Sequence, residues 1–285
     1  MTTTLDLIEA VSDKGGAVNE DVYGYSGNAA WVLDGATGLA DRQLLSPVSD
    51  GRAYVDVLSA SLHTLFATQT GPLSEVVEMA IRKVSDKFLP TLKKREAKTY
   101  EMPSAAMAMV RIRDGLLELA VLGDCRVLVQ MGADVVWLPH YSPLEALDRR
   151  LIEQISALHR QGIVNPDEVR KRMLDRFRAQ RSTMNTPEGY WALSFSLEAA
   201  AHLQTETVKS SRARHVLLVS DGFYRLVDTL HRFDPPGLLA AAVEGGLEPL
   251  VRRLRELERT DPDCVAWPRL KPQDDASAVL LSIGI

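Results

Sequence analysis

Short apolar runs separated by turns alternate along the chain with segments whose apolar residues recur every three or four positions. Such runs predict strands, and acid-glycine turns between them favour antiparallel hairpins. The runs that predict strands lie within residues 1–38 and at 106–112, 116–122, 127–131, 190–196, 215–220 and 276–283.

Helical spacing predicts two helices between Gly51 and Lys98, each with one apolar face suited to packing on a sheet. A second pair, mostly polar, is expected from Leu144 to Gln180, and further helices at 238–242 and 247–257. Strands grouped in runs with helices in pairs indicate an α+β fold. We therefore expect a single domain over residues 1–285, with a helical, flap-like insertion at about 143–181.

Composition is that of an ordinary globular protein: 285 residues, 46% hydrophobic and 25% charged, with a formal net charge of −5. This charge argues against a general nucleic-acid surface. No window approaches the roughly 18 apolar residues of a membrane span, and the first ten residues do not resemble a signal peptide. Cys125 and Cys264 cannot form a disulfide framework. We expect a soluble cytoplasmic protein without nucleic-acid or membrane partners; the oligomeric state stays open.

Aspartates stand where several apolar runs begin or end. Asp34-Gly35 and Asp221-Gly222 each close an apolar run, Asp124 lies in a turn between two runs, Asp274 precedes the last run, and Asp21 precedes an early one. A buried strand that ends in a carboxylate needs a partner for the charge. Carboxylates delivered by strand ends from distant parts of the chain are what a shared site for a hard cation requires.

Each of these segments also has a plainer interpretation. Asn19-Glu20-Asp21 is a common surface turn, Asp124 and Arg126 can form a local ion pair, and Asp274-Asp275 can be an Asx-turn. If the first segment is functional, Glu20 and Asp21 point to opposite faces, so that one binds a cation directly and the other through water.

Taken in order, the motifs resemble the metal-dependent serine/threonine protein phosphatases of type 2C. The segments that carry the resemblance span nearly the whole chain: Asn19-Glu20-Asp21, Asp34-Gly35-Ala36-Thr37-Gly38, Pro103-Ser104-Ala105-Ala106, Gly123-Asp124-Cys125-Arg126, Ser220-Asp221-Gly222 and Asp274-Asp275-Ala276-Ser277.

The resemblance implies a four-layer α/β/β/α sandwich of two antiparallel sheets flanked by antiparallel helix pairs, with two Mn²⁺ or Mg²⁺ ions at one end. It assigns Asp34 as the bridge between both ions, the Gly35 carbonyl with Asp21 or Glu20 to one ion, Asp221 and Asp274 to the other, and Asp124 to a third, weaker ion. Asp34 and Asp221 are then the catalytic pair. All-oxygen ligation suits these cations, and two of them make a bridging hydroxide available for attack on phosphorus.

Three departures from the family pattern stand out. Lys14 occupies the region where the family has a phosphate-binding arginine, and a lysine lacks the bidentate fork. Ala36 replaces the histidine of many eukaryotic members, which leaves no obvious proton donor to the leaving group. The segment between Gly123 and Ser220 lacks the family's usual flap motifs.

The resemblance predicts a metal-dependent phosphomonoesterase that acts on phosphoserine or phosphothreonine in proteins. The alternative is a weakly active or inactive pseudophosphatase that binds a phosphoprotein or another partner. A phosphoaspartate mechanism at Asp34 loses its support because position 36, where such enzymes carry a second acid, is Ala36.

Overall fold

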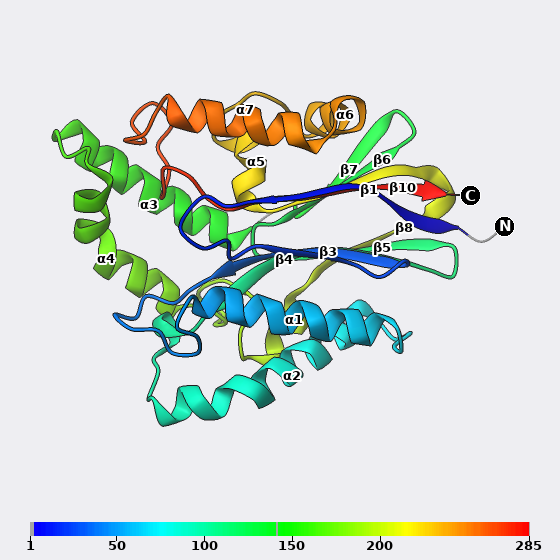
Figure 1. Cartoon of the computed structure of the whole chain (residues 1–285), viewed down its shortest axis with the longest axis horizontal. Helices are drawn as coiled ribbons and strands as arrows, with labels where there is room; N and C mark the ends of the chain where they lie inside the picture. Colours follow the sequence, from blue (N-terminus) through cyan, green and yellow to red (C-terminus); the bar gives the residue numbers. More distant parts are fainter. Residues whose placement is uncertain (1–2, 141, 285) are drawn as a thin grey trace.

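Two antiparallel sheets of five strands each lie face to face in the computed structural model, which describes residues 3–140 and 142–284 (Figure 1). The first sheet has the order β1-β10-β9-β6-β7 and the second has the order β2-β3-β4-β5-β8. The strands are β1 (Thr4–Asp13), β2 (Val22–Tyr25), β3 (Ala29–Ala36), β4 (Ser104–Arg113), β5 (Leu116–Leu122), β6 (Arg126–Met131), β7 (Asp134–Leu138), β8 (Gln204–Lys209), β9 (Ala213–Val219) and β10 (Ala276–Gly284).

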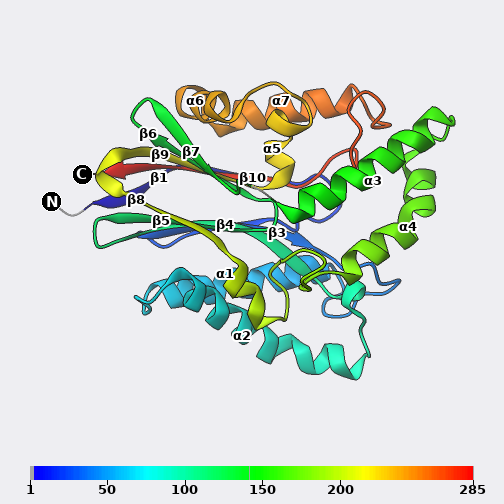
Figure 2. The same ribbon diagram turned by 180° about the vertical axis from the view of Figure 1, so that it is seen from behind.

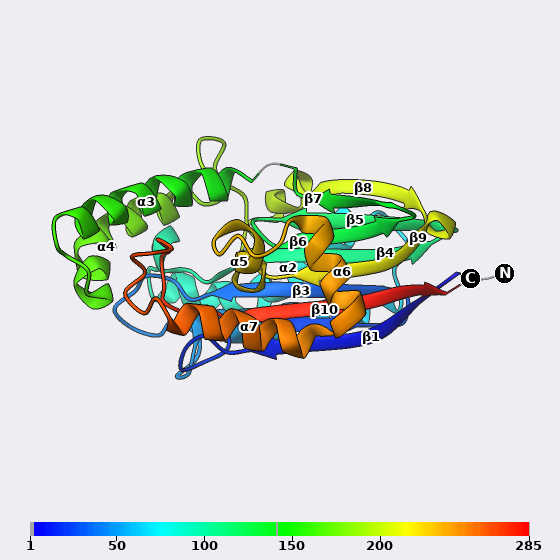
Figure 3. The ribbon, with the colours of Figure 1, turned by 90° about the horizontal axis from the view of Figure 1, so that it is seen from above.

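Helices cover both outer faces of the sandwich (Figures 1 and 2). One layer covers the β3 sheet and another covers the β10 sheet, while α3 and α4 extend beyond the end of the sheets that lies opposite the two termini (Figure 3). The helices are α1 (Asp50–Phe66), α2 (Leu73–Lys94), α3 (Pro143–Arg160), α4 (Pro166–Ser182), α5 (Asp221–Asp228), α6 (Pro235–Gly245) and α7 (Leu247–Arg259), with single 3-10 turns at Thr99–Glu101, Leu197–His202 and Ser210–Arg212.

Three apolar layers hold the elements together. Between the sheets, alternate residues of β3 and β9 such as Val32 and Leu218 are fully buried. The opposite faces of the same strands, for example Leu33 and Leu217, pack against α1 with α2 and against α5 to α7 respectively. Strands buried on both faces read as continuous apolar runs, which is why β3 and β9 were visible in the sequence.

The predicted fold class is confirmed: two antiparallel sheets are flanked by helices, and α3 and α4 lie where a polar helical pair was expected. The strand expected at 190–196 is wrong. There, only isolated bridges form, from Leu193 to Ala105 and from Tyr190 to Met184, because the apolar run serves as a buried loop that packs against the helices.

Strands β7 and β8 and helix α5 lie outside the predicted strands and helices. In the edge strand β8, exposed residues alternate with half-buried ones and most are polar, so no apolar run marks the strand. Helix α5 begins at Asp221-Gly222, where the sequence suggested a turn. Within the described residues, no helix has both the length and the apolar character needed to cross a bilayer.

Candidate active site

Carboxylates from distant parts of the chain meet at the end of the sandwich from which α3 and α4 project. Asp34 lies near the end of β3, Asp21 directly precedes its partner strand β2, and Asp221 directly follows β9. Asp274 precedes β10, which pairs with β9, and Asp124 lies in the turn between β5 and β6. Antiparallel pairing therefore brings the end of one strand beside the start of the next.

A cavity of about 930 Å³ opens at this point. Its walls come from the strand ends, from α3 and α4, and from the loop that precedes β10. The acidic groups and the glycine that line it include most of the predicted site: Glu20, Asp34, Gly35, Asp124, Asp221 and Asp274, together with Asp148 and Asp228.

Asp21 lies behind the cavity with its carboxylate unsatisfied. The residue is 2% exposed, and neither carboxylate oxygen has a hydrogen-bond partner. Burial raises its pKa well above the usual range, and the charges of Asp275 and Asp221 add to the rise. The hydroxyls of Ser220 and Ser277 lie near enough to temper this rise, but neither forms a direct hydrogen bond to the carboxylate. A buried, unpartnered carboxylate is costly unless a cation or a proton neutralises it.

Asp34 occupies the centre of the acidic group. Burial raises its pKa well above the usual range, and repulsion from Asp21, Asp221 and then Asp124 raises it further. Asp124 shows the same direction, with burial first and Asp221 next. We call Asp21, Asp34 and Asp124 the open half of the site, because no cationic side chain forms an ion pair with them in the described part of the chain.

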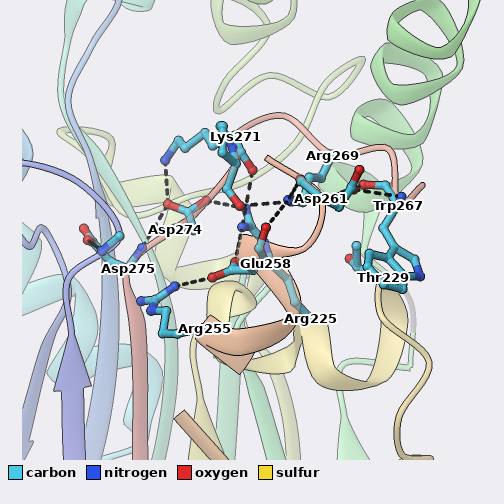
Figure 4. Close-up of polar contacts among 12 residues, drawn as sticks. Arg225, Thr229, Arg255, Glu258, Asp261, Trp267, Arg269, Lys271, Asp274 and Asp275 are labelled. Atoms are coloured by element: carbon cyan, nitrogen blue, oxygen red, sulfur yellow. Dashed lines mark hydrogen bonds and ion pairs between the residues drawn. The ribbon is translucent and has the colours of Figure 1, made fainter. Parts of the chain in front are cut away.

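Asp274 lies in the opposite situation (Figure 4). Its two oxygens accept from Arg225 Nη2 at 2.9 Å and from Lys271 Nζ at 2.7 Å. Burial alone would raise its pKa, but Lys271 and then Arg225 bring the net shift below the usual range. We call Asp274, Arg225 and Lys271 the paired half of the site.

The paired half continues into a buried ion network (Figure 4). Arg225 also donates to Glu258 at 2.9 Å, and Glu258 accepts from Arg255 at 2.7 Å. The Glu258 side chain is 0% exposed, so its charge depends on these two guanidinium groups. Burial would lower the pKa of Arg225, yet the surrounding carboxylates, Asp274 first, raise it above its usual value. Arg225 is thus fixed as a cation beside the cavity.

The Glu20 carboxylate accepts hydrogen bonds from other residues of the protein. It accepts from the Thr37 backbone at 3.0 Å and from the hydroxyls of Thr37 and Ser49, the residue that caps the N-terminus of α1. At the neighbouring Gly35, a Cβ atom would lie 2.4 Å from the Glu20 carbonyl oxygen, so only glycine fits. Glu20 therefore holds the turn after β3 against α1, and a cation contact through water stays a prediction.

Lys14 does not line the cavity; it is exposed in the loop after β1. The same loop is fixed by Asp275, whose oxygens accept from the Gly15 N–H at 2.8 Å and the Glu20 N–H at 2.7 Å. From the sequence, Asp275 was expected only to form an Asx-turn, but in the structure it joins the loop before β2 to the start of β10. Phosphate binding by Lys14 stays a prediction.

Helices α3 and α4 contribute residues that were not predicted from the sequence. Asp148 of α3 lines the cavity and accepts from Gln180 of α4 at 2.6 Å. Burial raises the pKa of Asp148 to about 6, and the charge of Asp221 acts in the same direction. Arg181 also lines the cavity. Their signal in the sequence was weak, because charged residues on a polar helical pair look like a solvated face.

The donor set fits a hard cation in part. Among residues 3–140 and 142–284, no three acidic, histidine or cysteine side chains already surround one point as ligands. The unpartnered oxygens of Asp21 and the repulsion centred on Asp34 are what Mn²⁺ or Mg²⁺ would relieve, since both prefer carboxylate and carbonyl oxygen. Asp274 fits less well, because two side chains already neutralise it.

Compared by sequence alone, the chain matches no protein-family model and no curated protein. Compared by structure, it is similar to the catalytic domain of the serine/threonine protein phosphatase PstP in complex with two manganese ions (TM-score 0.59, 16% identity, 100% of each chain). It is also similar to PppA, a regulatory component of the T6SS in Pseudomonas aeruginosa (0.59, 14%, 99% and 100%) and to the serine/threonine phosphatase Stp1 of Staphylococcus aureus (0.55, 14%, 97% and 94%).

These similarities cover the full length, at identities that establish the fold. The chain has the fold of the type 2C serine/threonine phosphatases, as its motifs predicted.

Proposed function

We propose that this protein is a phosphomonoesterase dependent on Mn²⁺ or Mg²⁺ that removes phosphate from phosphoserine or phosphothreonine in proteins. The observation that carries the proposal is the open half of the site: the buried Asp21 carboxylate has no hydrogen-bond partner, and Asp34 and Asp124 line a cavity of about 930 Å³ without an ion-pair partner among the described residues. Structural similarity to PstP, whose catalytic domain binds two manganese ions, supports the same metal dependence.

In this proposal Asp21, Asp34 and the Gly35 carbonyl would hold one cation, and Asp34 with Asp221 would hold the second. Asp124 is the candidate for a third, weaker ion. Bound cations would supply an activated water and neutralise charge on the phosphoryl group. The chain itself positions these groups: Asp275 fixes the loop that carries Asp21, and Glu20 fixes the turn that follows Asp34.

The leaving oxygen needs a proton, and Ala36 cannot give one. Asp148 lines the cavity and its pKa of about 6 leaves a useful protonated fraction near neutrality in the metal-free protein. Solvent in the open cavity is the other donor. Hydrolysis of small phosphate esters with acidic leaving groups should depend least on a proton from Asp148 or from solvent.

The paired half favours one alternative, a pseudophosphatase that binds phosphorylated partners without turnover. Arg225 and Lys271 already neutralise Asp274, so the site carries fixed cations where a second ion would otherwise bind. Such a site can attract a phosphate group without a full set of ions.

Metal-stripped protein should hydrolyse para-nitrophenyl phosphate and a phosphothreonine peptide when Mn²⁺ or Mg²⁺ is returned. Asp34→Asn should abolish this activity, and Mn²⁺ binding followed by electron paramagnetic resonance should weaken in parallel. Asp114→Asn is the matched control, since Asp114 is exposed in the β4–β5 turn at the far end of the sandwich. Mn²⁺ binding without turnover would support the pseudophosphatase; near wild-type activity in Asp34→Asn would contradict the site assignment.

A further inference from the structure

Arg181, in the last turn of α4, reaches across from the insertion to the turn that follows Asp34. Its Nη2 atom lies 3.0 Å from the carbonyl oxygens of Ala36 and Met102 and from Ser104 Oγ. Arg181 also lines the cavity. The insertion therefore brings a guanidinium group to the wall of the cavity beside the open half of the site.

The charge of this guanidinium has no direct counter-ion. No carboxylate forms an ion pair with it in residues 3–140 and 142–284, and its Nε is buried without a hydrogen-bond partner. Burial lowers the pKa of Arg181, and Tyr190 and Glu20 oppose the shift only from a distance. In contrast, the buried arginines elsewhere pair with carboxylates: Arg111 with Glu118, Arg225 and Arg255 with Glu258, and Arg269 with Asp261.

A half-buried guanidinium with an enclosed, unpaired donor and no counter-ion is unfavourable unless an anion lies beside it. Carbonyl and hydroxyl oxygens occupy only Nη2, and Nε is enclosed by protein, so Nη1, which is neither enclosed nor hydrogen-bonded within the described residues, remains for a ligand in the cavity. Arginine presents its N–H groups in a planar fork that matches phosphate oxygens. The exposed Lys14, the sequence's candidate for this role, is not at the cavity wall.

We propose that Arg181, supplied by the helical insertion, binds the phosphoryl group of the substrate. This assignment rests on the proposed function. The assignment gives helix α4 a direct role in the site. Phosphate affinity then depends on how α4 packs against β3 and β4.

The test measures binding of orthophosphate to the Mg²⁺-loaded protein by isothermal titration calorimetry, with the KM for para-nitrophenyl phosphate as a second readout. Loss of one charge-assisted hydrogen bond should weaken phosphate binding and raise KM about 10-fold or more in Arg181→Gln. Arg181→Lys keeps the charge without the fork and should restore part of the affinity. A smaller change in kcat is expected, because Asp34 and Asp221 are retained.

Arg178→Gln is the matched control. Arg178 lies one turn earlier on α4 and also bonds the loop after β3, through Leu39 O at 3.3 Å and Asp41 at 3.0 Å, but it does not line the cavity. If Arg181 only anchors α4, both glutamine variants should lower the melting temperature and leave phosphate affinity unchanged, and that result overturns the assignment.

Three outcomes separate this assignment from the proposed function. Wild-type turnover with unchanged phosphate affinity in Arg181→Gln and Arg181→Lys overturns the role of Arg181 alone. Arg181-dependent phosphate binding without turnover under any metal overturns the enzyme and keeps the role. Absence of both overturns both. Should Arg181→Gln fail to fold, Arg181→Lys decides, since wild-type phosphate affinity in that variant contradicts a need for the fork.

Discussion

Asp21 and Asp274 are the same residue type at the same end of the sandwich, each next to a strand, and both are largely enclosed by protein. Asp21 has no partner for either oxygen and its pKa is raised, whereas Asp274 accepts from Arg225 and Lys271 and its pKa is lowered. Burial acts on both in the same direction, so the difference comes from the neighbouring cations. The open half can be neutralised only by protons or by cations from solution, while the chain supplies its own cations to the paired half.

The largest effect on stability is expected in the paired half. Arg225→Met would leave Glu258 with one guanidinium and Asp274 with only Lys271. Because uncompensated buried charge is strongly destabilising, we expect the free energy of unfolding of the metal-free protein to fall by about 3–5 kcal/mol. Urea unfolding measures this.

Arg253→Met gives the comparison on the neighbouring helix. Arg253 is exposed and faces Glu256 at 3.9 Å, so its loss should change stability by less than about 0.5 kcal/mol. A similar small loss for Arg225→Met would show that the buried network contributes little.

Removing a charge from the open half should stabilise the metal-free protein, whereas removing one from the paired half should destabilise it. Asp21→Asn removes a buried carboxylate that has no partner, so the free energy of unfolding of the metal-free protein at pH 7 should rise by about 1–3 kcal/mol, the usual penalty of an unsatisfied buried polar group. The same variant should lose most of the rise in melting temperature that Mn²⁺ gives the wild type, because binding to the native state is what stabilises it. Thermal melts with and without Mn²⁺ measure both effects, and destabilisation of the metal-free variant would contradict the prediction.

How far the sequence predicted this site depends on which half is considered. The apolar runs before Asp34 and Asp221 marked buried strands ending in carboxylates. The residues of the open half and the fold could therefore be predicted from the hydrophobic pattern and the motifs. In the paired half, Asp274 was predicted as a site residue but its partner Arg225 was not, because Asp221-Gly222 reads as a turn. Only when α5 begins at Asp221 does Arg225 fall one helical turn later, where it can reach Asp274.

The segment 143–181 was predicted as a flap-like helical pair, but the residues that it contributes to the cavity were not predicted. Asp148, Gln180 and Arg181 resemble an ordinary solvated face in sequence, and only the packing of α3 and α4 against the strand ends directs them inward. Which face of a polar helix is covered depends on a tertiary contact that local periodicity does not contain.

Asp148 extends the comparison to pH. Its pKa rises from 3.8 to about 6 on folding, so its contribution to stability is fully present below about pH 4 and is lost as pH rises through 6. After a discount for partial exposure, the metal-free protein should lose about 1–2 kcal/mol from this group between pH 4 and 7. Asp148→Asn should remove that part of the pH dependence, measured by urea unfolding at pH 4.5 and 7. An unchanged slope would contradict the assigned pKa.

The smallest effect on stability is expected at Lys271. The Lys271 variant also tests whether the paired half competes with a bound cation or helps to hold it. The charge of Asp274 raises the pKa of Lys271, but the Lys271 side chain is 54% exposed, so the ion pair is screened by solvent. Because Arg225 still pairs with Asp274, Lys271→Met should change the free energy of unfolding by less than about 1 kcal/mol. Because the ammonium group occupies Asp274 Oδ1, its removal should tighten Mn²⁺ binding measured by electron paramagnetic resonance. Lys83→Met on the exposed face of α2 is the control. Weaker Mn²⁺ binding in Lys271→Met would mean that the lysine positions Asp274 for the ion instead of competing with it, and the two halves would then act as one site.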